Sequence, residues 1–584
     1  MNIAKMTAAA IIPALILATL LPVFSAQEDQ NEIAKWTFIV YIAADNNLES
    51  AGIEDINEME LIGSTEQVNI VVQFDRWRTS DDADDETNGD WTDTRRFLIQ
   101  KDSDRNIIGS EEVEILGEIN MGDPQELIDF TIWSMDNYPA ENYAVVLWDH
   151  GGAFWGVCWD ETVPNQDGHD HLDIDEVEYA LEKIYLHRGS EKIELLGFDA
   201  CLMAQMAVLY QIKDFASTVC ASGFSEPGDG WPYTEILGPL VSNPEMSEKE
   251  LAQVIVDEYV KSYPQPADQV STGISMAAFD MSKINDVALI LDRFSEELGK
   301  ESSLGVGLDY LFQIFWARNN AQSYDMVNLI QYDITGYPMY DVIDFTEELK
   351  DLISDAFPKN SDILTLCDEV KDVIENDFII RSRADGLHPN ARGLTMYFPN
   401  KEANQLELRQ LPTEYDPRYD ETDFARDHLW ENFLHAYYGI EPIKDSHPVC
   451  TIIGPEFNKT YSRDEERGEI WGTAYDREEI KAVEISIDGS EWEELPKQTG
   501  QGEITWRYSI NLQLLEPGRH EIQVRARDVI HTTEPVRTLI TIEPDEEKKD
   551  DGFRITDRMV EIMVMILIGV LFAFGMILYK GRSE

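Results

Sequence analysis

Basic residues are scarce in this 584-residue chain. It holds 46 Lys and Arg against 112 Asp and Glu, a formal net charge of -66. A surface of this sign repels phosphate backbones, so we exclude nucleic acid as a partner. Because 43% of the residues are hydrophobic and 10% are aromatic, the acidity is not that of a disordered chain. It indicates a solvated acidic surface, with calcium sites as the alternative.

Cysteine is also scarce. The chain holds five cysteines, an odd number, so they cannot all pair within one molecule. Outside the cytoplasm, at least one of them should therefore stay free or pair between chains. They are Cys158, Cys201, Cys220, Cys367 and Cys450.

Membrane signals occupy both ends of the sequence. Lys5 precedes an apolar stretch from Met6 to Phe24, and small residues follow at Ser25 and Ala26. This pattern predicts a signal peptide over residues 1–26, which sends the chain out of the cytoplasm.

The second membrane signal is an apolar stretch over residues 559–579, broken only by Glu561. As a helix, it is long enough to cross the roughly 30 Å hydrocarbon core of a bilayer. Lys580 and Arg582 follow it and should lie inside the cell. We therefore expect a single-pass cell-membrane protein, with a charged stalk over residues 545–558 and the large preceding portion outside. A retained N-terminal segment would leave the same portion outside.

Apolar runs of strand length alternate with amphipathic stretches of helix length from Trp36 onward. Such alternation predicts an α/β fold with a mostly parallel sheet between two layers of helices. The expected strands are Trp36–Asp45, Val68–Asp75, Tyr143–Asp149, Ile193–Asp199 and Ser217–Gly223, with further strands at Thr272–Asp280 and Arg392–Pro399. The expected helices between them include Pro124–Met135 and Asp173–Leu186.

The pattern changes after a short linker at Gly439–Ser446. Short alternating strands then follow at intervals, with turn residues such as Asp488–Gly489 between them. About seven such strands in about 100 residues predict an all-β immunoglobulin-like sandwich over residues 447–544. Residues 33–440 form the preceding domain.

Reactive residues follow two of the five strands. In a parallel sheet with crossover helices, catalytic groups gather beyond the carboxyl ends of the strands. One strand leads into His150 and Gly151, and another leads into Cys201. An imidazole can accept the proton of a thiol and later protonate a leaving amine. The placement therefore predicts a nucleophile, Cys201, next to a general acid and base, His150.

The surrounding backbone fits the same chemistry. The N–H groups of Gly151 and Cys201 could hold an oxyanion. A helix expected over Leu202–Ile212 would favour the thiolate through its N-terminal dipole. The alternatives are that Cys201 is a small buried apolar residue and that His150 is a loop residue. Their joint placement favours catalysis.

Several blocks of sequence resemble, in the right order, the signature blocks of the clostripain family of cysteine peptidases. The resemblance spans roughly residues 35–438. It implies a caspase-like three-layer sandwich, a fold shared with gingipains and legumains. The blocks are VVQFDRW (Val71–Trp77), DTRRFLI (Asp93–Ile99), Met121–Gly156, LLGFDACLMAQ (Leu195–Gln205), SEPGDGWPY (Ser225–Tyr233) and RGLTMYFP (Arg392–Pro399).

The resemblance also implies an activity. It assigns a Cys-His dyad to Cys201 and His150, and cleavage of protein or peptide substrates after basic residues, Arg above all. Asp199 and Asp229 match the acidic positions of the primary specificity pocket, where a carboxylate can pair bidentately with guanidinium. Asp199 could instead cap the following helix, and Asp229 could be an ordinary turn residue.

Two rival functions stay open. The scaffold could serve a catalytically silent surface protein for adhesion or assembly. As an enzyme, the chain could instead cleave after Asn or Asp. The choice between basic and Asn or Asp specificity depends on Asp199 and Asp229.

Calcium dependence is a further implication of the resemblance, and no organic cofactor is expected. Asp167–Asp175 and Asp81–Glu86 cluster oxygen ligands of the kind that hard cations prefer. Neither segment has the spacing of an EF-hand, so each could be a solvated face. His169 and His171 could suggest zinc, but the sequence offers no third ligand at a convincing spacing.

One departure from the family concerns activation. Members are often activated by self-cleavage at a basic residue between the His and the Cys, yet residues 151–182 contain neither Lys nor Arg. We therefore expect activity as a single chain.

Overall fold

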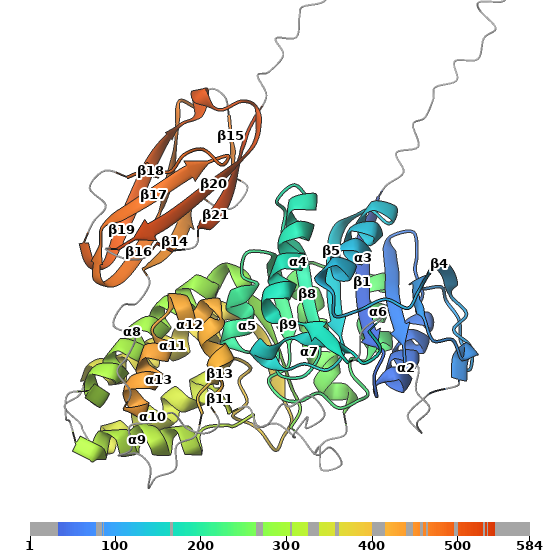
Figure 1. Ribbon diagram of the computed structural model, residues 1–584, viewed down its shortest axis with the longest axis horizontal. Helices are drawn as coiled ribbons and strands as arrows, with labels where there is room; N and C mark the ends of the chain where they lie inside the picture. The colour runs from blue at the N-terminus through green and yellow to red at the C-terminus, as the bar shows by residue number, and fades with distance from the viewer. Residues whose placement is uncertain are drawn as a thin grey trace, which may run out of the picture. The chain divides into compact units, whose positions relative to one another are not determined.

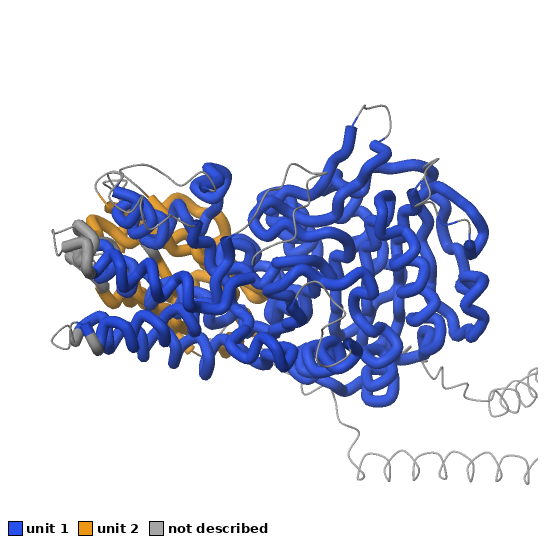
Figure 2. The backbone as a smooth tube through the Cα atoms, turned by 90° about the horizontal axis from the view of Figure 1, so that it is seen from below, with its two compact units in different colours: residues 1–447 blue, residues 448–584 orange. Residues whose placement is uncertain are grey.

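The structure is a computed structural model, and its chain divides into two compact units, residues 1–447 and 448–584 (Figure 2). The boundary lies next to the predicted linker. The structure describes residues 33–77, 85, 87–163, 168–263, 273–303, 307–324, 338–356, 361–399, 415–439, 448–455, 459–462, 465–495, 500–528, 532–533 and 535–543.

A nine-stranded sheet forms the centre of the first unit (Figure 1). Its order is β12-β10-β9-β8-β5-β1-β2-β3-β4. The strands are β1 (Ala34–Ala44), β2 (Val68–Arg76), β3 (Thr94–Leu98), β4 (Glu111–Gly117), β5 (Ala140–Trp148), β8 (Ile193–Asp199), β9 (Ala216–Ala221), β10 (Ser275–Asp280) and β12 (Ile379–Ala384).

The prediction of a mostly parallel sheet holds for the centre of the sheet, whereas the sheet as a whole is mixed. The five strands expected from the first apolar runs are mutually parallel and adjacent, as β2, β1, β5, β8 and β9. At both edges the pairing turns antiparallel, so four of the eight pairings between neighbours are antiparallel. The described residues between β2 and β3 and between β3 and β4 contain no α-helix. Antiparallel pairing needs no crossover helix.

Alternation along β1 shows why the sheet lies between two helical layers. Ile39 and Tyr41 belong to one buried cluster, and Phe38 and Val40 belong to a second cluster on the opposite face. Successive side chains of a strand point to opposite faces, so a continuous apolar run supplies both cores. The first face is covered by α3 (Pro124–Asn137), α4 (Ile174–His187) and α5 (Met206–Gln211), and the second by α2 (Glu49–Glu60), α6 (Tyr233–Ser242) and α7 (Glu248–Ser262).

Local signals start several of these helices. The Asp123 side chain accepts a hydrogen bond from the Gln125 N–H (2.9 Å) at the start of α3, where Pro124 needs no donor. At α7, Ser247 and Glu250 exchange hydrogen bonds in a capping box. These caps satisfy N–H groups that the first turn leaves without partners.

The segment after β10 adds a group of packed helices. They are α8 (Ile284–Ser303), α9 (Gly307–Asn320), α10 (Val342–Ala356), α11 (Ser361–Asp372), α12 (Asp423–Asp427) and α13 (Trp430–Tyr438). The strand expected at Arg392–Pro399 is shorter, as β13 (Thr395–Tyr397). It pairs with β11 (Met339–Asp341) in a two-stranded sheet and not with the central sheet. A second small sheet joins β6 (Val157–Asp160) and β7 (Asp170–Leu172).

The second unit contains two sheets that enclose one apolar core. The sheets have the orders β14-β16-β19 and β15-β21-β20-β17-β18, and both contribute buried residues to the core around Trp506. The strands are β14 (Val449–Gly454), β15 (Lys459–Tyr461), β16 (Arg467–Ile480), β17 (Ala482–Ile487), β18 (Glu493–Glu494), β19 (Gly500–Asn511), β20 (Gly518–Arg527) and β21 (Val536–Ile542). The unit is a β-sandwich, and its immunoglobulin-like class stays a prediction.

The predicted signal peptide (1–26), stalk (545–558) and membrane helix (559–579) lie outside the described residues. Within the described part of the chain, no helix is both long and apolar enough to span a membrane.

Candidate active site

The sheet brings the two reactive strand ends together. β5 and β8 are parallel neighbours, and their last paired residues are Trp148 and Asp199. His150 and Cys201 each lie two residues beyond this pair. Gly151 approaches Cys201 so closely that a Cβ atom there would lie 2.8 Å from the Cys201 nitrogen. The glycine therefore permits a backbone approach that any larger residue would block.

Burial sets the protonation state of His150. Its side chain is buried, and this burial lowers its pKa from 6.5 to about 4. Its Nε2 lies 3.0 Å from Oδ1 of Asn47. An amide oxygen only accepts hydrogen bonds, so Nε2 carries the proton and Nδ1 is the basic nitrogen. Near neutral pH the ring is thus an uncharged proton acceptor.

Asp149 has a structural role next to this histidine. Its carboxyl group accepts hydrogen bonds from the Asn46 side chain (2.8 Å) and from the Trp159 backbone N–H. Burial raises the pKa of Asp149 well above its usual value. These bonds tie the loop after β5 to the segment after β1 and to β6.

Cys201 is only partly buried, whereas the other four cysteines are buried, and all five are free thiols. The Glu226 backbone N–H donates to its sulfur at 3.2 Å. Burial raises the pKa of the Cys201 thiol, and hydrogen bonds from the backbones of Glu226 and Gly151 oppose this rise. The resting pair is therefore a neutral thiol and a neutral imidazole.

The expectation that a helix starts directly after Cys201 is wrong. α5 begins at Met206, and Leu202 has a left-handed backbone with a φ of 67°. A helix cannot include that conformation, so the dipole of α5 does not act on the thiol. Instead, the chain turns sharply, and the Leu202 N–H donates to the Phe224 carbonyl (3.1 Å). This turn presents the cysteine at the edge of the sheet.

Three carboxyl groups are buried next to the cysteine. Asp199 accepts hydrogen bonds from the Tyr233 hydroxyl (2.9 Å) and the Trp231 N–H (3.3 Å). Burial raises its pKa to about 7. Burial, followed by the charge of Asp199, raises the pKa of both Asp55 and Glu226 well above their usual values. The acids would repel one another once ionised, and an incoming cation would stabilise the ionised forms.

The two predicted pocket residues differ in burial. Asp199 is buried in this acidic group and is the last residue of β8, so it does not cap a helix. Asp229 is exposed and lines a surface hollow of about 550 Å³ together with residues of α2 such as Glu54 and Asn57.

Sequence reasoning missed Asp55, Glu226 and Asn47. Glu226 lies in the SEPGDGWPY block, whose other acid is Asp229. A choice between these two acids needed the burial of each side chain. No sequence motif marked Asp55, because it lies in α2, far along the chain from Asp199 and Glu226, and only the fold brings it to the site. Its carboxylate accepts a hydrogen bond from the Trp148 indole at 2.7 Å.

Comparison with known proteins identifies the family of the chain. The model of the clostripain family matches residues 40–437. The chain belongs to the clostripain family. It is a cysteine peptidase.

The individual proteins that the chain resembles share less than a quarter of its residues over the aligned region. Clostripain of Hathewaya histolytica is 23% identical over 429 residues, which cover 64% of this chain and 77% of that protein. A secreted C11 cysteine protease of Bacteroides thetaiotaomicron, solved with an irreversible peptide inhibitor, is 19% identical, with a TM-score of 0.44 and coverage of 63% of this chain and 94% of that one. An inactive zymogen C11 protease of Parabacteroides distasonis is 16% identical, with a TM-score of 0.44 and coverage of 67% and 97%.

Among the described residues of Asp167–Asp175, one of the two loops predicted to bind calcium, no group of acids converges. In the described part of Asp167–Asp175, Asp170 accepts a hydrogen bond from Asn120 (2.7 Å), and His171 stacks on Trp159. Within Asp81–Glu86, only Asp85 is described. Among the described residues, acids converge at two other places.

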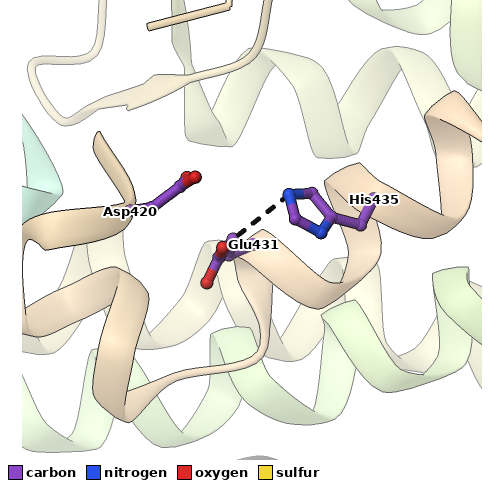
Figure 3. A group of neighbouring side chains, drawn as sticks. All are labelled: Asp420, Glu431 and His435. Atoms are coloured by element: carbon purple, nitrogen blue, oxygen red, sulfur yellow. Dashed lines mark ion pairs between the residues drawn. The ribbon is translucent and has the colours of Figure 1, made fainter. Parts of the chain in front are cut away.

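The first of these places lies on α13. Figure 3 shows Glu431 and His435 one helical turn apart and facing each other, with Asp420 opposite them. The Glu431 and His435 side chains are 3.7 Å apart. Burial raises the pKa of Glu431 to about 8 and lowers that of His435, so both side chains are mostly uncharged near neutral pH. The second place consists of Asp45, Asp75, Glu118 and Asp160.

Proposed function

We propose that this cysteine peptidase is an endopeptidase that cleaves after basic residues, Arg in particular, through Cys201 and His150. The observation that carries the proposal is the position of Glu226. Its backbone N–H contacts the Cys201 sulfur, while its buried carboxyl lies next to that of Asp199, which in turn neighbours Asp55. A basic side chain would thus be bound beside the nucleophile.

The proposed reaction uses the neutral pair directly. His150 takes the thiol proton on Nδ1 as the Cys201 sulfur attacks the carbonyl carbon of the substrate. The N–H groups of Gly151 and Cys201 stabilise the oxyanion. His150 then gives the proton to the leaving amine, and a thioester forms. Water, deprotonated by His150, hydrolyses the thioester to a carboxylic acid and restores the thiol.

Charge explains the proposed specificity. The three carboxyls are buried together, and a guanidinium among them replaces mutual repulsion by paired, charge-assisted hydrogen bonds. A neutral Asn side chain would leave the repulsion in place, and an Asp side chain would add to it. The site therefore favours Arg or Lys over Asn or Asp.

We further propose the cellular arrangement that the sequence predicts. Residues 1–26 direct the chain out of the cytoplasm, and residues 559–579 anchor it in the cell membrane as a single-pass protein. The immunoglobulin-like unit and the stalk then separate the peptidase from the membrane or dock partners.

The test is hydrolysis of matched fluorogenic peptides that end in Arg, Lys, Asn or Asp by the purified chain. We expect Arg and Lys peptides to be cleaved, with no turnover by Cys201→Ala. Asp199→Asn should lower kcat/KM for the Arg peptide by about 30-fold or more, as for loss of one partner of a buried charge pair.

Asp229→Asn is the matched control, since it removes the same charge from an exposed position. It should have a smaller effect than Asp199→Asn. Preference for the Asn or Asp peptide, or turnover that survives Cys201→Ala, would refute the proposal.

A further inference from the structure

Four acids converge at one edge of the central sheet. Asp45 follows β1, Asp75 is near the end of β2, Glu118 follows β4 and Asp160 ends β6. One carboxylate oxygen from each lies within 4.8 Å of the others. We call these four residues the acidic quartet. β1, β2 and β4 run in the same direction, so their carboxyl ends meet at this edge.

Burial makes the acidic quartet costly as it stands. Asp45, Asp75 and Asp160 are each 0% exposed. One oxygen of Asp45 accepts from the Thr162 hydroxyl (3.0 Å), and one of Asp75 accepts from the Thr94 hydroxyl (2.7 Å). In both aspartates, Oδ2 is buried without a hydrogen-bond donor. A buried carboxylate oxygen that lacks a donor is rare in native proteins and calls for a partner.

The charges around the acidic quartet have one sign. The pKa of Asp45 is raised to about 9, mainly by burial. The next largest causes are the negative charges of Asp160 and then Glu118. For Asp75, the corresponding charges are Asp160 and Asp45.

A neighbouring arginine is already engaged elsewhere. Arg76 directly follows Asp75 in β2, but its guanidinium pairs with Glu49 at 2.7 Å and is 1% exposed. It also donates to the Thr87 carbonyl at 3.2 Å. Among the described residues, the charges that act most strongly on Asp45 and Asp75 are all negative, so a bound cation would stabilise the acidic quartet.

We propose that the acidic quartet binds a calcium ion. Oxygen ligands without nitrogen or sulfur suit a hard cation, and carboxylates of this number match calcium sites. Calcium lies about 2.4 Å from its ligands, so oxygens on opposite sides of the ion are about 4.8 Å apart. The spread of the acidic quartet fits within that sphere. The site lies outside both loops that the sequence suggested.

The position of Asp45 links this site to the proposed catalytic residues. Asn46, the next residue, donates to the Asp149 carboxyl, and Asn47 accepts from His150. On the other side, Trp159 precedes Asp160 and donates its N–H to Asp149. A bound ion would hold both segments and so orient the imidazole. This link, unlike the ion site, rests on the proposed function.

The test measures thermal unfolding of the full-length chain after treatment with EDTA, with and without added calcium chloride. Calcium should raise Tm by at least about 3 °C at saturation, since it binds the folded state. In Asp45→Asn/Asp75→Asn the shift should vanish, while Tm in EDTA should equal or exceed that of the wild type because repulsion is relieved. Asp75→Asn alone is the milder variant if the double variant does not fold.

Two variants locate the ion. Asp175→Asn removes an exposed acid from the predicted loop Asp167–Asp175, and Asp199→Asn removes one from the acidic pocket. Both should keep the full calcium shift. A wild type without a shift, a shift that survives in Asp75→Asn, or a shift with magnesium chloride but not with calcium chloride would overturn the proposal.

Kinetics test the link to His150 separately. Removal of calcium should lower kcat for an Arg peptide with little change in KM, because the pocket acids are not moved. A chain without activity towards any peptide would refute the proposed function but would leave the calcium-dependent Tm intact. A fall in KM alone would contradict the link.

Discussion

Burial shifts the pKa of the proposed base, His150, and the pKa of the proposed pocket residue, Asp199, in opposite directions. It lowers the pKa of His150, since the charged form of a histidine is the protonated one, and raises that of Asp199, since the charged form of an acid is the deprotonated one. The free site near neutral pH therefore holds an uncharged base and acids that are only partly ionised. Substrate binding and catalysis should then titrate at different pH values.

The first prediction is a rise in kcat/KM for an Arg peptide as the pH increases through about 7. Asp199 loses its proton there and gains attraction for the guanidinium, and kcat/KM reports ionisation of the free enzyme. His150, with a pKa of about 4, is already neutral over this range. Steady-state assays between about pH 5 and pH 9 measure the profile.

Asp199→Asn is the control for this profile, since its amide does not titrate. The rise near pH 7 should disappear in this variant, which leaves a lower and flatter profile. If the rise persists at the same pH, it belongs to another group.

At the scale of strands and helices, glycines at the strand ends allow the close packing that shapes the site. Gly197 in β8 lies against the buried Trp231, whose backbone N–H donates to Asp199. A Cβ atom at Gly197 would lie 2.6 Å from the Trp231 ring and 3.2 Å from Val146. The indole thus occupies the space that a side chain on β8 would need.

The second prediction concerns Gly197→Ala. The added methyl group should displace Trp231 and lower the free energy of unfolding by about 1–3 kcal/mol, as overpacking of a core does. It should also lower kcat/KM for Arg peptides, because the segment from Glu226 to Tyr233 moves with the tryptophan. Urea titration and peptide assays measure the two effects.

Gly238→Ala is a matched control for this change. Gly238 lies in α6, and its nearest contact to an added Cβ would be Ile62 at 3.6 Å, so the methyl group fits. Alanine in a helix should raise stability by up to about 1 kcal/mol. Equal losses in both variants would contradict the role assigned to Trp231.

The sequence predicted the elements better than the way they pair. Long apolar runs define a strand covered on both faces, and the expected Ile193–Asp199 agrees with β8. β10 and β12 pair antiparallel at one edge of the sheet. The periodicity of apolar residues predicts a strand but not the direction in which it pairs. The turn at Leu202 was missed for a similar reason: its sequence has helical spacing, but contacts with Phe224 impose a left-handed residue.

The strand ends carried more information than the sequence analysis used. Four of the five expected runs end in Asp, at Asp45, Asp75, Asp149 and Asp199. The rule that placed His150 and Cys201 at neighbouring ends applies equally to Asp45 and Asp75. Glu118 and Asp160 could not be added from the sequence, because they reach the group through an edge strand and a small separate sheet.

At the scale of the whole molecule, the two units differ in what they hold. Every residue placed in the candidate active site and in the acidic quartet belongs to the first unit, whose two cores lie on opposite faces of its sheet. The second unit encloses a core of its own. The groups proposed for catalysis therefore need no residue from the sandwich.

The net charge of -66 spreads a repulsion over the molecule that is distinct from the local repulsion in the acidic quartet. Exposed charges are screened when salt shortens the Debye length, from about 10 Å at 0.1 M to about 3 Å at 1 M, whereas buried groups are screened much less. Folding brings the acids closer together, so salt should favour the folded state.

The third prediction is thus a rise in Tm between about 0.05 M and about 1 M sodium chloride, with the same rise in potassium chloride because screening depends on ionic strength. Calorimetry in EDTA measures it without divalent cations. Asp45→Asn/Asp75→Asn should keep this salt dependence in full, since it removes only 2 of 112 acids, although it should lose the response to calcium. A salt effect that disappears in this variant would show that the acidic quartet, and not the surface, carries the repulsion that salt relieves.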